Sequence, residues 1–323
     1  MTMIEVLEAG LETAVQDFPG RIGMLRHGIP PSGPLDEWSF RLANKIVGNP
    51  EGAAGLECQF LGPTLRFHNE AVISVCGADM RPHLDDSPVP MWSSISVRPG
   101  QVLSLGPAII GARSYIAFSG GLDVPEVMGS RATYVVASLG GVNGVALRRG
   151  VRLDVRSPTH RVSTGEVAPG AIRPPIRNEK QRLIRVVAGP NDDWISRTGH
   201  ERFCSAEWRL SSRSNRVGFR IEGPKFDYSP VASDKPRESG SDPSNTIDIG
   251  YPIGGINLAG DTPIILLHDC ITLGGFIVPY TVPSCEFWKL AQSRPWDLLR
   301  FEFIDVKQAQ AERRRIDAIF APG

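Results

Sequence analysis

Four regions of the chain combine glycine with amide, carboxylate and guanidinium side chains. They are residues 16–21 with 27–36, residues 120–131, residues 214–220 with 223–225, and residues 242–261 with 274–275. Glycine lets backbone N–H groups approach a small ligand closely. Amide, guanidinium and ammonium groups add further donors, and donors held in fixed positions can stabilise a developing oxyanion. The same glycines suit the turns of a β-barrel, so both interpretations stay open at this point.

Motifs for other kinds of chemistry are missing from the sequence. It contains no phosphate-binding P-loop, no G-x-G-x-x-G after a strand and no G-x-S-x-G nucleophile elbow. The six histidines never lie at i, i+2 or i, i+4 from one another, so no metal site is predicted. His268 and Asp269 follow an apolar run, where a polar pair fits an active site and a satisfied strand end equally well.

The five cysteines are widely scattered and form no C-x-x-C pair. This spacing excludes a zinc knuckle and a thioredoxin-like redox motif. Free cysteine is among the residue types most often buried, so we expect buried free thiols.

Short strands must position these polar regions. The 34 glycines and 27 prolines leave little room for long helices and favour strands joined by turns. Seven apolar runs have the length and composition of strands: Ala71–Val75, Val102–Leu105, Arg113–Phe118, Leu183–Val187, Gly218–Ile221, Pro263–Leu267 and Leu298–Phe303. Helical spacing of apolar residues or helix-forming composition predicts three helices, over Leu35–Val47, Ser284–Gln292 and Val306–Phe320.

A polar, proline-containing stretch divides the chain near its middle. Such a segment cannot bury enough surface to offset the entropy of ordering it. We therefore predict an N-terminal β domain over 3–156, a linker over 157–181, a C-terminal β domain over 182–304 and a terminal helix or tail over 305–323. The predicted fold class is mainly β, with two β-barrel-type domains and a few short helices.

The charge balance argues against some classes of partner. Lys and Arg number 35, and so do Asp and Glu, which leaves a formal net charge of zero. Nucleic-acid binding and anionic membrane surfaces normally require a basic face, so neither partner is expected. The N-terminus does not have the build of a signal peptide, and no apolar run approaches 18 residues, so we expect a cytoplasmic protein.

The polar regions resemble the carboxyltransferase A–B family, which includes allophanate hydrolase subunit 2 and KipA-like proteins. The matching residues in the first half are Val15–Asp17, Gly20–Arg21, Gly28, Pro30, Ser32–Gly33, Asp36, Ala43–Asn44, Gly48–Asn49, Gly120–Gly121, Asp123–Pro125 and Gly129–Arg131. In the second half they are Ser214–Arg216, Gly218, Arg220, Gly223–Pro224, Gly260–Asp261, Gly274–Gly275 and Gln292. The resemblance runs from about residue 4 to about residue 303.

This resemblance implies an A-like first domain and a cyclophilin-like, B-like barrel as the second. It also implies a subunit of a biotin-dependent carboxylase, which transfers a carboxyl group from carboxybiotin to a small urea- or amide-like substrate. On this basis Asn215, Arg216 and Lys225 are predicted catalytic donors toward the biotin or carboxyl oxygens. The residues predicted to position the substrate are Asn245, Asp248, Tyr251 and Asp269.

The implied cofactor is biotin carried on a separate protein, with ATP used only through partner subunits. The expected partners are a KipI-like or C–D domain carboxyltransferase subunit, a biotin carrier and a biotin carboxylase. The chain contains no A-M-K-M biotinylation motif, so we expect separate chains to supply these functions.

Two other functions fit the same resemblance. Pro243–Asn245 and Asp248 match the urea carboxylase pattern H-P-S-N-I-H-D, but Asp242 and Ile247 replace its two histidines. Gly250–Gly254 is closer to the G-Y-P-x-G of KipA and of the C subunit of 5-oxoprolinase. The alternatives are therefore the C subunit of an ATP-dependent 5-oxoprolinase and a non-catalytic, KipA-like regulatory partner of a KipI-like protein.

Overall fold

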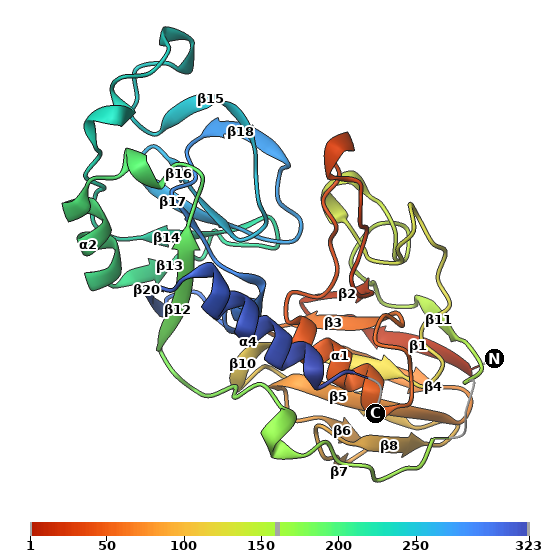
Figure 1. Ribbon diagram of the computed structural model, residues 1–323. Helices are drawn as coiled ribbons and strands as arrows, with labels where there is room; N and C mark the ends of the chain where they lie inside the picture. Colours follow the sequence, from red (N-terminus) through yellow and green to blue (C-terminus); the bar gives the residue numbers. More distant parts are fainter. Residues whose placement is uncertain (1, 159–161, 322–323) are drawn as a thin grey trace. The chain divides into compact units, whose positions relative to one another are not determined.

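A computed structural model describes residues 2–158 and 162–321, and within them the chain forms strands β1–β20 and helices α1–α4 (Figure 1). The predicted mainly β class with few helices is confirmed. The chain divides into two compact units. Unit 1 comprises Met1–Ile22, Pro31–Asn178 and Ala318–Gly323, and unit 2 comprises Gly23–Pro30 and Glu179–Asp317. The predicted domains and linker stay a prediction, and part of that linker, residues 159–161, lies outside the described residues.

Unit 1 consists of two sheets that share one core. The first has the order β11-β1-β4-β9-β6-β7, with β1 at Thr2–Glu8, β4 at Thr64–Phe67, β6 at His83–Leu84, β7 at Ser87–Pro88, β9 at Val102–Ser104 and β11 at Arg152–Val155. The second has the order β2-β3-β10-β5-β8, with β2 at Glu12–Gln16, β3 at Gly55–Gln59, β5 at Ala71–Asp79, β8 at Ser94–Val97 and β10 at Ile110–Phe118. Phe67 of the first sheet and Ile116 of the second are fully buried in the common core. Burial of both sheets' apolar faces stabilises this unit.

Helix α1, Glu37–Ile46, packs against β5 and β10. Asp36 caps its N-terminus by accepting a hydrogen bond from the backbone N–H of Ser39 at 2.9 Å. The side chains of Trp38, Leu42 and Ile46 are buried, as the helical spacing of the sequence predicted.

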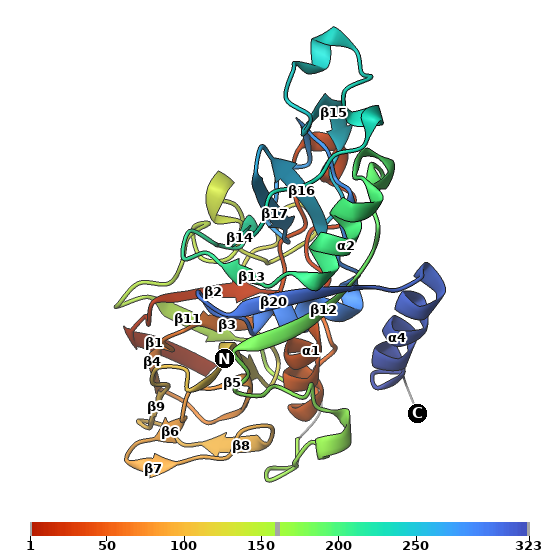
Figure 2. The same cartoon turned by 90° about the vertical axis from the view of Figure 1, so that its left-hand side faces the viewer.

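Unit 2 contains a closed barrel (Figures 1 and 2). Its strand order is β12-β19-β16-β17-β14-β13-β20, with β12 at Gln181–Ala188, β13 at Trp208–Leu210, β14 at Gly218–Glu222, β16 at Gly255–Ala259, β17 at Thr262–Leu266, β19 at Tyr280–Thr281 and β20 at Leu298–Phe303. The parallel pairing of β12 with β20 is part of this ring. Phe203 stacks between Tyr280 and Phe301, with ring centroids 3.9 Å and 4.5 Å away.

A two-stranded ribbon accompanies the barrel in unit 2 (Figure 1). It consists of β15 at Asn245–Gly250 and β18 at Leu273–Phe276, which pair antiparallel. The ribbon brings the two parts of the fourth polar region, 242–261 and 274–275, side by side.

All seven predicted runs are strands, namely β5, β9, β10, β12, β14, β17 and β20. The predicted helix at Ser284–Gln292 is a 3-10 turn, Ser284–Glu286, followed by α3 at Phe287–Ala291, and the terminal helix is α4 at Val306–Ala318. Helix α2, Arg197–Ser205, was not predicted, because Gly199 and Phe203 are its only buried residues and it shows no apolar stripe. The other 3-10 turns lie at Leu25–His27, Val135–Ala137, Gly170–Ile172, Asp192–Trp194, Pro230–Ala232 and Arg237–Ser239.

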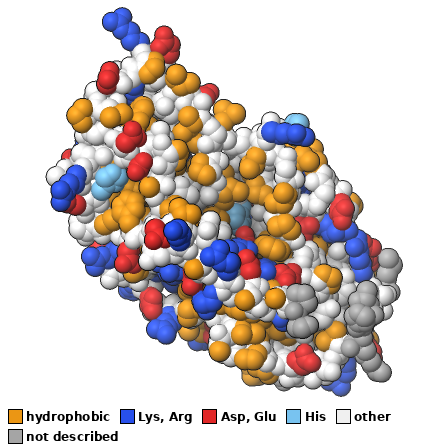
Figure 3. All heavy atoms as spheres, viewed as in Figure 1, with side chains coloured by type: hydrophobic (Ala, Val, Ile, Leu, Met, Phe, Trp, Pro, Cys, Tyr) orange, Lys and Arg blue, Asp and Glu red, His pale blue; other side chains and the backbone are white. Residues whose placement is uncertain are grey.

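Basic and acidic side chains are interspersed over the face of the molecule drawn in Figure 3. This agrees with equal numbers of basic and acidic residues in the sequence.

Among the described residues, no helix combines the length and apolar character needed to cross a bilayer.

The polar segments at 16–21 and 120–131 bind each other within unit 1. The carboxylate of Asp17 accepts hydrogen bonds from Ser130 Oγ and the Arg131 backbone N–H, both at 2.6 Å, and from the Ala132 backbone N–H at 3.1 Å. The guanidinium of Arg21 donates to the carbonyl oxygens of Val127 and Ala132 at 2.9 and 2.7 Å. These contacts assign the two segments a structural role, joining two loops distant in the sequence.

We predict that Asp17→Ala lowers the free energy of unfolding by about 3 kcal/mol, because three donors lose a buried, charged acceptor. Urea unfolding measures the change. Asp86→Ala, which removes an exposed carboxylate from the same unit, is the matched control and should change stability by less than about 0.5 kcal/mol. Equal stability of the two variants would contradict a structural role for Asp17.

Candidate functional site

The pairing of β14 with β17 determines which polar residues of unit 2 meet. The two strands are antiparallel, and Gly218 at the start of β14 lies opposite Leu266 at the end of β17. Residues just before β14 and just after β17 therefore lie at the same end of the pair. Two backbone hydrogen bonds extend the contact, from Leu267 N to Val217 O and from Asp269 N to Arg216 O, both at 3.1 Å.

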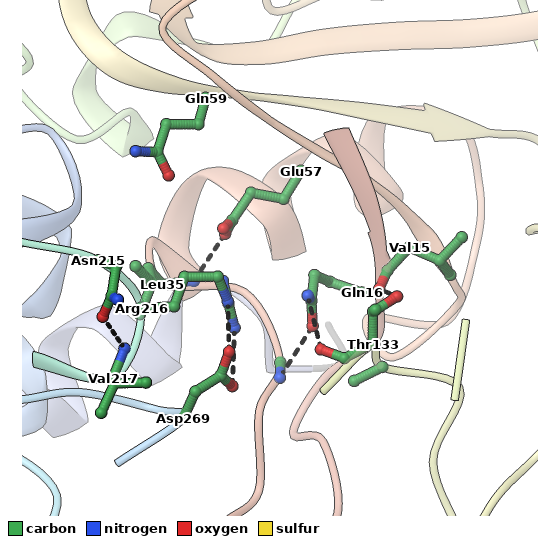
Figure 4. A network of polar contacts seen from close by, with 12 residues as sticks. Val15, Gln16, Leu35, Glu57, Gln59, Thr133, Asn215, Arg216, Val217 and Asp269 are labelled. Carbon is green, nitrogen blue, oxygen red and sulfur yellow. Dashed lines mark hydrogen bonds and ion pairs between the residues drawn. The ribbon is translucent and has the colours of Figure 1, made fainter. Parts of the chain in front are cut away.

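At this end Arg216 and Asp269 form a buried ion pair (Figure 4). Arg216 Nε donates to Asp269 Oδ2 at 2.9 Å, and Nη2 donates to Oδ1 at 3.4 Å. Two-point contact fixes the plane of the guanidinium as well as its position. The structure thus brings together one predicted donor and one predicted substrate-positioning residue.

Asn215 precedes this pair in the loop before β14. Its side-chain Oδ1 accepts a hydrogen bond from the backbone N–H of Val217 at 2.9 Å, which closes a local turn (Figure 4). The residue is exposed, and the bond occupies the oxygen of its amide. A ligand at this loop would meet the amide nitrogen, a hydrogen-bond donor.

Lys225 lies away from the other two predicted donors. Arg216 precedes β14 and Lys225 follows it, so the five residues of the strand, about 16 Å, separate them. The Lys225 Nζ contacts Asp261 Oδ2 at 3.1 Å, just before β17, and both side chains are mostly exposed. The β14–β17 pair thus has a buried ion pair at one end and an exposed one at the other.

The remaining predicted positioning residues lie on the ribbon or directly after its first strand. Asn245 is the first residue of β15 and lies opposite Phe276 of β18, and Asp248 is exposed further along β15. Tyr251 is buried, and its Oη accepts a hydrogen bond from the Phe276 backbone N–H at 2.9 Å. Gly274 has to be glycine here, because a Cβ at this position would lie 2.8–3.0 Å from the Tyr251 side chain. Tyr251 therefore anchors the ribbon; whether it also positions a substrate stays a prediction.

A cavity of about 260 Å³ lies beside these elements in unit 2. Its lining residues are Arg213, Asn215, Val217, Gly218, Arg220, Asn257, Ala259, Ile264, Leu266, Ile271 and Phe276. Alternate residues of three adjacent strands form one wall, because successive side chains of a strand face opposite ways. Arg220 of β14, Ile264 of β17 and Asn257 of β16 lie in one row across this wall.

Asn257 was not singled out from the sequence, although it lies within the fourth polar region. It is 3% exposed, and its side-chain Oδ1 has no hydrogen-bond partner among the described residues. The one feature of the sequence that could have indicated Asn257 is that its amide stands between Ile256 and Leu258, in a strand whose other residues are apolar or glycine. Sequence alone did not reveal that this amide faces a cavity.

Figure 4 also shows a polar network within unit 1. The carboxylate of Glu57 accepts hydrogen bonds from the Leu35 backbone N–H and from Tyr115 Oη, both at 2.9 Å. Burial, with the nearby charge of Glu57, raises the pKa of Tyr115 well above its usual value, so this phenol remains protonated and donates. Gln16 joins the Gly33 backbone N–H to the Thr133 carbonyl, at 3.0 and 3.3 Å. These bonds connect the loop before α1 to β2 and β3, and connect β2 to the loop at Thr133.

The thiols have the surroundings of buried, unreactive groups. Cys58, Cys76, Cys270 and Cys285 are buried, and Cys204 is partly buried, so burial is confirmed for four of the five. Desolvation raises the pKa of Cys270 to about 12 and that of Cys285 to about 11, which keeps both as neutral thiols near pH 7.

No group of three or more potential metal-ligating side chains gathers within residues 2–158 and 162–321.

The sequence matches a known family over residues 27–303, described as carboxyltransferase domain, subdomain A and B. This chain belongs to that family. The resemblance inferred from the motifs is confirmed at this level, and the loop holding Asn215 and Arg216, the ribbon and the cavity all lie within the matched residues.

Relatives with described activities fall into two groups. The urea amidolyase of Lachancea kluyveri is 38% identical over 97% of this chain, which covers 18% of that protein. The C subunit of the Haemophilus influenzae 5-oxoprolinase is 30% identical, and 97% of this chain covers 95% of it. The crystal structure of the Kluyveromyces lactis urea carboxylase aligns with 98% of this chain and 29% of its own, at 37% identity and a TM-score of 0.91. The chain thus spans less than a third of the urea amidolyase and urea carboxylase relatives.

We predict that the two ion pairs at the ends of the β14–β17 pair differ in their contribution to stability. Asp269→Ala should lower the free energy of unfolding by about 3–5 kcal/mol, because it leaves the Arg216 charge buried without its carboxylate. Asp261→Ala, at the exposed end of the same strands, should cost at most about 1 kcal/mol. Denaturant unfolding of both variants measures the difference.

The double variant Arg216→Met/Asp269→Leu provides the internal control. It removes both charges together, so it should recover most of the stability lost in Asp269→Ala. A double variant no more stable than Asp269→Ala would show that the loss does not come from an uncompensated charge.

Proposed function

We propose that this chain acts in a multi-component biotin-dependent carboxylase and transfers a carboxyl group from carboxybiotin to a small urea- or amide-like substrate. The observation that carries the proposal is the similarity to urea amidolyase, which extends over 97% of the chain at 38% identity. The proposed partners are a KipI-like or C–D domain subunit, a biotin carrier and a biotin carboxylase. ATP would be used only by those partners.

The residues of unit 2 fit a site for a neutral amide or ureido group. Asn257 presents a buried amide at the wall of the cavity, and Asn215 presents an exposed one from the loop beside it. Arg213 and Arg220 also line this cavity and add positive charge. Biotin, when bound, supplies the carboxyl group and a ureido ring whose N–H and carbonyl groups such side chains can bind.

In this proposal the chain's own residues stabilise negative charge on the reacting group and keep that group oriented. Asn215 donates from its amide nitrogen to an oxygen that gains negative charge. Its oxygen is already bonded to Val217 N, so the donor direction is set before a ligand arrives. Arg216 is held by Asp269 at the base of the same loop, and this two-point contact keeps the loop in position. Preorganised donors of this kind stabilise a transition state without reorganisation.

A role as the C subunit of a 5-oxoprolinase is the second candidate. It is favoured by the coverage of 95% of the Haemophilus influenzae protein and by the sequence Gly250–Gly254, typical of that branch. The cyclic amide of 5-oxoproline carries the same N–H and carbonyl groups as urea, so the same cavity would serve either substrate.

Copurification of the chain with the products of neighbouring genes separates the two candidates. The isolated complex is tested for carboxylation of urea and guanidine that depends on both biotin and ATP, and for ATP-dependent opening of 5-oxoproline. Biotin-dependent carboxylation supports the leading proposal. Opening of 5-oxoproline without biotin would replace it by the second.

We predict that Asn215→Asp lowers kcat of carboxyl transfer by about 100-fold or more in the reconstituted complex. The aspartate keeps the oxygen that binds Val217 N, so the turn is retained, but it removes the amide donor. Steady-state kinetics measure the effect, and size-exclusion chromatography should show an unchanged complex.

Asn69→Asp is the matched control. Asn69 is exposed in unit 1, and its Oδ1 likewise accepts a backbone hydrogen bond, from Met3 N at 3.0 Å. We expect its kcat to stay within about twofold of the original chain. Full turnover in Asn215→Asp would exclude this residue as a donor.

A further inference from the structure

The wall formed by β14, β17 and β16 is mostly apolar but carries two polar side chains, those of Arg220 and Asn257. Gly218, Ala259, Ile264 and Leu266 give it an apolar surface, and the single buried amide among them belongs to Asn257. On the opposite face of the same strands, Ile256, Leu258 and Ile265 are fully buried, so this part of the sheet is packed on that side. Asn257 therefore faces the cavity side of a packed wall.

The amide of Asn257 has unused hydrogen-bonding capacity. Its Oδ1 is buried and accepts no hydrogen bond from the residues that the structure describes. A buried acceptor without a partner costs free energy, and folded proteins rarely keep one without a reason. A half-turn about the last side-chain torsion exchanges the oxygen and the nitrogen, so the acceptor can be presented to the cavity. A ligand N–H would then satisfy it.

We propose that Asn257 accepts a hydrogen bond from an N–H of an amide or ureido group bound in this cavity. This inference rests on the proposed function and names the group that the chain would hold. The apolar wall contacts the carbon skeleton of the ligand, and Asn215 with Arg213 and Arg220 faces its carbonyl oxygen. The volume of about 260 Å³ accommodates a small ring compound.

This chemistry has two possible sources in the proposed reaction. One is the acceptor substrate, such as urea or a cyclic amide, and the other is the ureido ring of biotin. Both present N–H donors next to a carbonyl oxygen, so the cavity alone does not distinguish them. The binding experiment therefore includes probes for each.

The test measures binding of 2-imidazolidinone, a five-membered cyclic urea, to the full chain by NMR titration. Its 1,3-dimethyl derivative keeps the ring and the carbonyl but has no N–H, and it should bind at least tenfold more weakly. Urea, 2-pyrrolidinone and biotin are titrated in parallel. Stronger binding of biotin than of 2-pyrrolidinone assigns the cavity to the cofactor ring, and the reverse order assigns it to the substrate.

Asn257→Leu replaces the amide by an apolar side chain of similar size. We expect binding of 2-imidazolidinone to weaken at least tenfold and the preference over the dimethyl derivative to disappear. Because Oδ1 makes no internal hydrogen bond to the described residues, the midpoint of thermal unfolding should stay the same or rise. A merely structural role would instead lower the midpoint and leave the preference intact, which would overturn the proposal.

Ala259→Leu, which fills the cavity without touching the amide, is the second variant. It should abolish binding of every probe, and unchanged binding would show that the ligand lies elsewhere. The titrations need neither partners nor turnover, so they are independent of the proposed function. Selective binding without carboxyl transfer would retract the proposed function alone, and transfer without N–H-dependent binding would retract this inference alone.

Discussion

The antiparallel register of β14 and β17 is the constraint on which the candidate site depends. It places the loop before β14 against the residues after β17, and the buried pair of Arg216 and Asp269 joins them at 2.9 Å. A buried ion pair is costly unless its geometry is good, so this contact tolerates few alternative registers. A shift of one residue would turn every side chain of a strand to the opposite face. Arg220 of β14, which lines the cavity, would then turn away from it.

The four glycine-containing polar regions of the sequence have different roles in the folded chain. In unit 1, Asp17 and Arg21 satisfy the backbone of the 120–131 segment, and glycine serves turns and close loop contacts. In unit 2, the regions around Asn215 and Asn245 flank the cavity, and Gly274 makes room for Tyr251 in the ribbon. Segments of similar composition thus form contacts between loops in unit 1 and line a cavity in unit 2. Only the tertiary structure shows which segment has which role.

Much of the fold could be predicted from local pattern. Alternating apolar residues identified strands such as β20, and helical spacing identified α1, because both patterns reflect burial of one face. Helix α2 could not be found, since it buries little apolar surface. Of the residues predicted for the site, Arg216 and Asp269 are in contact and Asn215 directly precedes Arg216, but Lys225 lies at the far end of β14. Strand pairing sets such distances, and a single sequence does not display the pairing.

The central claim is that one wall of unit 2, carrying Asn257 and bordered by Asn215, holds an amide or ureido group. A crystal structure of the full chain soaked with 2-imidazolidinone tests it most directly. The account predicts the ring against Ile264 and Leu266, with an N–H within about 3 Å of the Asn257 side-chain oxygen. Density for the ring at another place, with the cavity empty and the Asn257 amide unchanged, would contradict it.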